Sequence, residues 1–220
     1  MQPYFITGTD TDSGKTYVTR ELLRHSLQHQ HKAHAIKLVA SGCVLVDHGL
    51  VSQDDMAYPT LARYTQKQQK NPWRYQLPVS PHIAAKAEGA LLSLEALQRY
   101  CFQETFSDLT YLFIEGAGGL MAPLTAQHTW VDFLICSRIP VILVVGMRLG
   151  CLNHALLTQA VLRHYSISCF GWIANILDDK MLALAENIQT LQQRLVFPWL
   201  ATIDYGGALP AEFDLGGYCG

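Results

Sequence analysis

The stretch that decides the fold is GTDTDSGKT, at residues 8–16. It follows an apolar segment of strand length, Tyr4–Thr7, and opens a helical pattern over Lys15–Gln28. Its Gly-Lys-Thr ending is typical of a loop that binds nucleotide phosphates, in which backbone N–H groups and a helix N-terminus face the anion. The stretch predicts a nucleotide-binding loop with Lys15 on the β- and γ-phosphates and Thr16 on Mg²⁺.

The loop is one residue longer than the usual pattern. Four residues normally separate its first glycine from the Gly-Lys pair, whereas five residues lie between Gly8 and Gly14 here. The alternative interpretation is a glycine-containing turn with a chance Gly-Lys-Thr ending. The position of the stretch between a strand and a helix disfavours that alternative, and the extra residue indicates a subclass of phosphate loop.

The rest of the chain alternates apolar segments of strand length with segments of helical period. We expect strands at Tyr4–Thr7, Ala33–Val39, Tyr111–Glu115, Pro140–Gly146, Cys169–Asn175 and Trp199–Asp204. We expect helices at Lys15–Gln28, Asp55–Tyr64, Leu94–Phe106, Val131–Ser137, Leu152–His164 and Lys180–Leu195. This alternation predicts a P-loop NTPase-like α/β fold of three layers, with a mostly parallel central sheet and helices on both faces. We expect one domain over residues 1–220, with a long loop at 66–82 and an irregular tail at 206–220.

Composition excludes several classes of protein. Of the 220 residues, 50% are hydrophobic and 15% are charged, and the net charge is −2, so the chain can bury a core but has no basic patch for a nucleic acid. The apolar run at 139–147 is well short of the roughly 20 residues that a membrane span needs. The N-terminus lacks the features of a secretion signal, and the six cysteines form no CxxC pair. We expect a cytoplasmic protein with free thiols and without nucleic-acid or membrane partners.

Charged residues near the ends of other predicted strands are further candidates for the site. Lys37 ends the second strand, at the sheet edge where open α/β proteins bind ligands, although a solvated strand-end lysine is the alternative. Asp54 suits either a helix N-cap or a Mg²⁺ ligand. Glu115 precedes a glycine-rich run, GAGG at 116–119, and lies where a phosphate-loop protein commonly places a metal carboxylate.

Several motifs, in the same order along the chain, resemble those of the dethiobiotin synthetase family. They are GTDTDSGKT at 8–16, KLVASG at 37–42, Asp54, SPHIAA at 80–85, EGAGG at 115–119 with Pro123-Leu124, PVILVVGMRLGCLNHALLT at 140–158 and GWIAN at 171–175. The family pattern usually reads GTDTxVGKT, KPVASG and VGxKLGC. Ser13, Leu38 and Arg148 are therefore departures, and none of them removes a functional group. Asp204-Tyr205 stands where the family often has Pro-Trp.

The resemblance implies an ATP-dependent ring-closing ligase. In this family 7,8-diaminononanoate, CO₂ and ATP give dethiobiotin, ADP and phosphate, through a carbamate and a carbamic-phosphoric anhydride. The implied catalytic residues are Lys37, Lys15 and Thr11. The implied metal ligands, for Mg²⁺, are Thr16, Asp54 and Glu115.

The resemblance also implies binding residues and a quaternary structure. The implied substrate contacts are Ser41, Gly150, Cys151 and Asn153. The implied nucleotide contacts are Asp12, Ser13, Gly14, Lys15, Thr16, Tyr17, Asp54, Glu115, Gly116, Ala117, Gly118, Asn175 and Ile176. In this family the turn at 150–153 comes from the neighbouring subunit, so the resemblance implies a homodimer with its sites at the interface.

Two other functions are compatible with a phosphate loop. A partition-type regulatory ATPase has a similar sheet, but its signature lysine lies five residues before the Gly-Lys lysine, where this chain has Asp10. A kinase or ligase acting on another small metabolite would share the loop. KLVASG at 37–42 together with the turn at 150–153 disfavours this second alternative.

Overall fold

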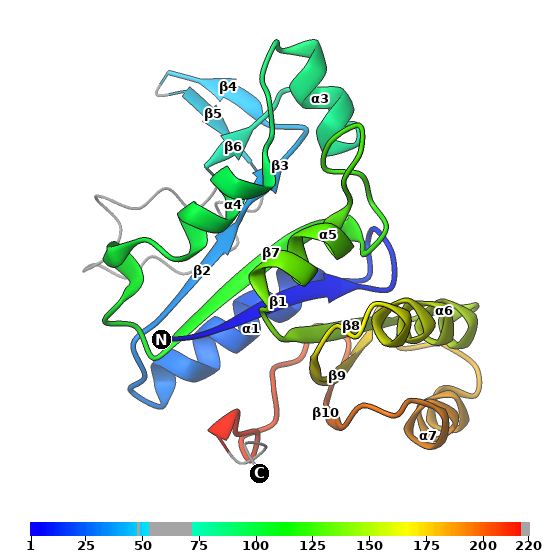
Figure 1. The fold of residues 1–220 in the computed structure, drawn as a ribbon. Helices are drawn as coiled ribbons and strands as arrows, with labels where there is room; N and C mark the ends of the chain where they lie inside the picture. Colours follow the sequence, from blue (N-terminus) through cyan, green and yellow to red (C-terminus); the bar gives the residue numbers. More distant parts are fainter. Residues whose placement is uncertain (48, 53–71, 217–220) are drawn as a thin grey trace.

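A six-stranded parallel sheet forms the centre of the computed structural model, which describes residues 1–47, 49–52 and 72–216 (Figure 1). Its strands are β1 (Gln2–Gly8), β2 (Ala33–Lys37), β7 (Tyr111–Gly119), β8 (Val141–Met147), β9 (Cys169–Ile176) and β10 (Trp199–Ile203). They lie in the order β10-β9-β8-β1-β7-β2, and each neighbouring pair is parallel. The predicted α/β class is confirmed.

Helices cover both faces of this sheet. They are α1 (Lys15–Gln28), α3 (Pro81–Ala87), α4 (Leu94–Cys101), α5 (Trp130–Ser137), α6 (Cys151–His164) and α7 (Leu184–Arg194), with a 3₁₀ turn at Glu104–Phe106. Two short pairs of strands lie outside the sheet: β3 (Val39–Ala40) with β6 (Trp73–Arg74), and β4 (Val44–Val46) with β5 (Gly49–Val51). Within the described ranges, no helix is long and apolar enough to cross a bilayer.

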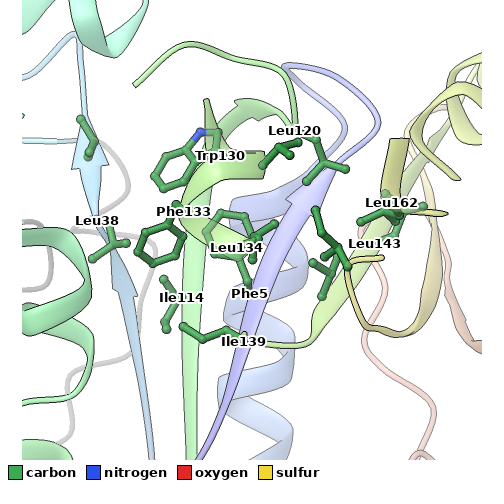
Figure 2. Close-up of a cluster of buried hydrophobic side chains, with 14 of the residues drawn as sticks. Phe5, Leu38, Ile114, Leu120, Trp130, Phe133, Leu134, Ile139, Leu143 and Leu162 are labelled. Atoms are coloured by element: carbon green, nitrogen blue, oxygen red, sulfur yellow. The ribbon is translucent and has the colours of Figure 1, made fainter. Parts of the chain in front are cut away.

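Two hydrophobic cores follow from the period-2 alternation of side chains along the strands. Phe5 packs on the face that α4, α5, α6 and α7 cover, and its ring lies 5.1 Å from that of Trp130 (Figure 2). Its neighbours Tyr4 and Ile6 pack on the opposite face, against α1. The tail reaches this second core through Leu209, Phe213 and Leu215, which are buried. The described part of the tail is therefore irregular in backbone but packed.

Strand register brings the predicted site residues to one edge of the sheet. Lys37 at the end of β2 pairs with Glu115 of β7, and Ile6 of β1 pairs with the same Glu115 from the other side. β1 runs directly into the phosphate loop after Gly8. Because parallel strands end at the same edge, residues about 80 to 100 positions apart in the sequence meet beside that loop.

Several predicted element boundaries are wrong. The strand expected at 33–39 stops at Lys37, because the chain then leaves β7 and pairs with β6, where Trp73 N–H donates to the carbonyl oxygen of Leu38. The helix expected at 94–106 ends at Cys101, since Gln103 has an extended backbone. The helix expected at 180–195 begins at Leu184, after the left-handed Ala183.

The loop expected at 66–82 is also partly wrong, because β6 and the first turn of α3 lie within it. Residues 66–71 and the predicted helix Asp55–Tyr64 lie outside the described residues. The sequence analysis did not predict α3 or the strands β4 and β5. Pro81 at the first position of α3 is the signal that could have identified that helix.

Candidate active site

A cavity of about 1040 Å³ opens at the carboxyl edge of the sheet, beside the phosphate loop. It brings together ten of the predicted site residues: Thr11, Asp12, Gly14, Lys15, Thr16, Lys37, Ser41, Glu115, Ala117 and Gly118. The remainder of its lining comes from Thr9 and Asp10, residues 78–81, residues 119–122 and one side of α6. Residues from five separate segments of the chain therefore share one cavity.

The phosphate loop has a conformation that depends on Gly14. This residue has a φ of 87° and directly precedes α1, in the left-handed region that favours glycine. A Cβ atom there would overlap the side-chain amide of Asn175, whose Nδ2 donates to the carbonyl oxygen of Ser13 at 3.1 Å. Asn175 is buried in β9, so its hydrogen bond holds the loop against the sheet. Asp12 also has a left-handed backbone, with a φ of 56°.

Opposite charges meet around Glu115, which is fully buried. Its Oε1 lies 3.1 Å from Nζ of Lys37 and accepts a hydrogen bond of 2.7 Å from the hydroxyl of Thr16. A buried carboxylate is costly unless it is paired and hydrogen-bonded, and both conditions hold here. The solvated-lysine alternative for Lys37 is therefore wrong, since only 15% of this side chain is exposed.

Lys15 is a buried cation in the same cluster. Its Nζ donates to the carbonyl oxygen of Asp10 at 2.8 Å, and the residue is 7% exposed. Burial lowers the pKa of Lys15 to about 8; Glu115 opposes this shift and the like charge of Lys37 adds to it. An anion placed beside Lys15 and Lys37 would relieve this like-charge repulsion, so the cluster suits phosphate groups.

The oxygen atoms beside the two lysines fit a magnesium ion. The hydroxyl of Thr16 and the carboxylate of Glu115 already converge, and Mg²⁺ prefers such hard oxygen donors together with substrate phosphates and water. No group of three or more His, Cys, Asp or Glu side chains is arranged for a metal in the described ranges. Asp54 lies outside the described residues.

Eight of the implied site residues do not line this cavity: Ser13, Tyr17, Gly116, Gly150, Cys151, Asn153, Asn175 and Ile176. Ser13 belongs to the phosphate loop, and Asn175 supports that loop through its hydrogen bond to the carbonyl oxygen of Ser13. The hydroxyl of Tyr17 donates to the carbonyl oxygen of Gly207 at 2.6 Å, which ties α1 to the segment after β10. In the turn before α6, Gly150 and Asn153 are exposed, whereas the predicted substrate contact Cys151 is only 2% exposed.

Sequence reasoning gave no role to two residues that meet at the mouth of the cavity. Asp10 lines the cavity, and its Oδ2 lies 2.9 Å from Nη2 of Arg148. Residues 78–81 and Met121 were also missed as lining residues. The motif SPHIAA at 80–85 was the available signal for the first of these segments.

Comparisons with known proteins show the family of this chain. A family model described as an AAA domain matches residues 2–212. The ATP-dependent dethiobiotin synthetase BioD of Legionella pneumophila (strain Lens) is 50% identical over 209 residues, which cover 95% of this chain and 96% of that protein. The chain belongs to the dethiobiotin synthetase family. A dethiobiotin synthetase from Pseudoalteromonas translucida is 39% identical, over 96% of this chain and 93% of that protein.

Solved structures show how widely the fold of this dethiobiotin synthetase is shared. A ParA family ATPase from Chlorobium tepidum has a TM-score of 0.57 at 12% identity, over 92% of this chain and 84% of that chain. A MinC:MinD complex from Aquifex aeolicus has a TM-score of 0.56 at 12% identity, over 92% of this chain and 81% of that chain. At these identities the likeness shows the fold alone. The P-loop fold is confirmed, and the assignment to a ligase family comes from the closer relatives.

Proposed function

We propose that this dethiobiotin synthetase closes a ureido ring on 7,8-diaminononanoate with CO₂ and ATP, and releases dethiobiotin, ADP and phosphate. The observation that carries the proposal is the pair of lysines, Lys15 and Lys37, beside the phosphate loop in one cavity. The 50% identity to a named dethiobiotin synthetase supports the choice of substrates. A cytoplasmic location is part of this proposal, because ATP is available there.

The chemistry needs cations but no protein nucleophile. One amine of the substrate adds to the carbon of CO₂ and loses a proton, which gives a carbamate. A carbamate oxygen then attacks the γ-phosphorus, and the bond to ADP breaks. The second amine attacks the carbonyl carbon of this mixed anhydride and loses a proton, phosphate leaves with the bonding electrons, and the ring closes. The second step brings the anionic carbamate to the anionic γ-phosphate and the last releases anionic phosphate, so positive charge in the site stabilises these transition states.

The two lysines divide this work in the proposal. Lys15 is held at the phosphate loop and serves the carbamate and the γ-phosphate together. Lys37 lies on the other side of Glu115 and balances charge that develops as the phosphoryl group moves. The hydroxyls of Thr11 and Ser41 line the same cavity and are suited to hydrogen bonds with the carbamate and the diamine.

Thr16, Glu115 and Asp54 would hold the magnesium ion in this proposal. The ion supplies charge neutralisation on the phosphates when it is bound. Lys37 and Thr16 both contact the carboxylate of Glu115. Asn175 serves the nucleotide indirectly as well, because its amide supports the loop at Ser13.

A homodimer completes the proposal. No residue of the turn at 150–153 lines the cavity of its own chain, and Asn153 is exposed. Its position at the start of α6 is favourable for an anion, such as the carboxylate of a substrate bound to a second copy. Leu149, which directly precedes this turn, is 98% exposed and gives an interface apolar surface to bury.

Phosphate release from ATP tests the proposed reaction. The acceptor of the γ-phosphate is a carbamate, which forms only when the diamine and CO₂ are both present. Omission of either the diamine or bicarbonate should therefore leave a trace of hydrolysis. Full-rate phosphate release without the diamine would overturn the proposal in favour of a regulatory ATPase, and release with a different amine or acid would favour another ligase or kinase.

A further inference from the structure

Asp10 lines the cavity, and each of its three oxygen atoms has a partner. Its Oδ2 lies 2.9 Å from Nη2 of Arg148, and its Oδ1 accepts the backbone N–H of Thr11 at 2.7 Å. Its carbonyl oxygen accepts Nζ of Lys15 at 2.8 Å. A change in the position of Asp10 would therefore move the loop residue Thr11 and the acceptor of Lys15 together.

Arg148 links this loop to the outgoing end of β8. The loop is already joined to β8 through Thr9, whose N–H donates to the carbonyl oxygen of Val144 at 3.0 Å. Arg148 directly follows β8, and its own carbonyl oxygen accepts the N–H of Cys151 at 2.9 Å, the first residue of α6. One residue thus contacts the phosphate loop through its side chain and the turn before α6 through its backbone.

We propose that Arg148 is a positioning residue that holds the phosphate loop through Asp10, and that it couples ATP in its own subunit to substrate bound at its turn. The coupling half rests on the homodimer of the proposed function. In that arrangement the loop serves one active site and the turn serves the other. Arg148 then connects the two sites of the dimer through a single residue, with its side chain on one site and its backbone on the other.

Energetics set the size of the expected effect. The side chains of Arg148 and Asp10 are 39% and 51% exposed, and ion pairs this exposed contribute at most about 1 kcal/mol. Loss of the pair should leave the unfolding temperature close to that of the wild type. A difference of 1 kcal/mol corresponds to about a fivefold change in an equilibrium constant, so Arg148→Gln should raise the KM for ATP by about that factor.

Matched variants separate positioning from a general structural effect. Arg148→Lys keeps the charge that the family usually has here and should restore most of the ATP affinity. Asp10→Asn keeps an oxygen for Thr11 N–H and removes the charge that Arg148 meets. If Arg148 acts through Asp10, the double variant should resemble each single variant, because the same contact is lost in all three. Additive losses would overturn the claim that Arg148 acts through Asp10.

Two mixed dimers of differently tagged chains test the coupling. In the first, one chain carries Arg148→Gln and the other carries Lys37→Leu, so the live site has the altered loop and an intact turn. In the second, a wild-type chain pairs with a chain carrying both changes, so the live site has an intact loop and an altered turn. A wild-type chain paired with a Lys37→Leu chain is the control.

The first mixed dimer should show the raised KM for ATP, and the second should show a KM for the diamine about threefold above the control, which is under 1 kcal/mol. An unchanged KM for ATP in the first overturns the positioning role. An unchanged KM for the diamine in the second overturns the coupling. A monomeric mass for the wild type overturns the homodimer and the coupling with it, while Arg148→Gln alone still tests positioning.

Discussion

The two halves of the proposed active site differ in how completely a single chain builds them. Around the phosphate loop, Glu115 is fully buried and pairs with Lys37 and Thr16 of the same chain. The turn before α6 lies outside that chain's cavity, and its Gly150 and Asn153 are exposed although Cys151 is buried. Buried charges must be satisfied within the fold, whereas an exposed turn can serve a second molecule. The difference predicts that ATP binding needs one chain and that diamine binding needs two.

The largest expected effect comes from the lysines of the nucleotide half. Lys15→Ala should weaken ATP binding and turnover together, with a loss in kcat/KM on the order of 10²–10³. Lys37→Leu should lower kcat by a similar factor and leave ATP affinity within about tenfold, or roughly 1.4 kcal/mol. Titration calorimetry with ATP and steady-state kinetics measure the two quantities separately.

Two controls accompany the lysine variants. Lys37→Arg should also be impaired, because a planar guanidinium does not replace a compact ammonium. Thermal unfolding must show that each variant is folded, since Lys37→Leu leaves the buried Glu115 with a lost partner. Equal losses of ATP affinity in the Lys15 and Lys37 variants would contradict the division of roles.

The second largest expected effect tests whether the diamine site is built by one chain or by two. Asn153→Trp should block the turn and weaken diamine binding by about 30-fold, roughly 2 kcal/mol, with ATP binding unchanged. A mixed dimer of this variant with Lys37→Leu has one site whose lysine and turn both come from unmutated positions. Coexpression with two tags, purification and assay should show activity above either parent. Absence of recovery, in a sample shown by mass to be dimeric, would refute the shared site.

A smaller effect concerns pH and the nucleotide half alone. The pKa of Lys15 is lowered to about 8, so the free protein loses this proton above pH 8. Bound phosphates favour the charged ammonium, so ATP binding above pH 8 requires proton uptake. ATP affinity should therefore fall as pH rises, and the decrease should approach about tenfold per pH unit.

Calorimetry from pH 7 to 9.5 would locate the pH at which ATP affinity begins to fall. Lys37→Leu is the matched variant, because removal of this like charge should raise the pKa of Lys15 and move that pH upward. The same onset in both proteins, or an affinity independent of pH, would show that the Lys15 ammonium does not control ATP binding. Diamine binding to the opposite turn should not share this profile.

The smallest effect tests how well the nucleotide half is packed. Ser13 is buried, and its hydroxyl has no hydrogen-bond partner among the described residues. An unsatisfied buried hydroxyl is unfavourable, so Ser13→Ala should raise the free energy of unfolding by about 1 kcal/mol. Thr19→Val in α1 is a matched control, since the Thr19 hydroxyl is equally buried and unpaired there. Urea denaturation without ATP measures both, and a loss of stability in Ser13→Ala would reveal a partner for its hydroxyl.

Local chemistry made much of the nucleotide half predictable from the sequence. The glycine-rich loop and Lys15 follow one another within nine residues, and a strand before them with a helix after them completes the motif. The alternation of apolar segments identified the six strands of the sheet, because buried parallel strands are apolar on both faces. Element ends were less predictable, as the early end of β2 at Lys37 shows, because pairing with β6 decides that boundary.

The sequence by itself determined the phosphate loop, the α/β class and the family resemblance, because these depend on residue type and spacing along the chain. Only the tertiary structure decided which distant residues touch. Parallel register placed Lys37 beside Glu115, and strand order placed Asn175 beneath Ser13. The ion pair of Asp10 with Arg148 spans 138 positions in the sequence. No local pattern encodes such a contact, because it arises from the packing of β1 beside β8.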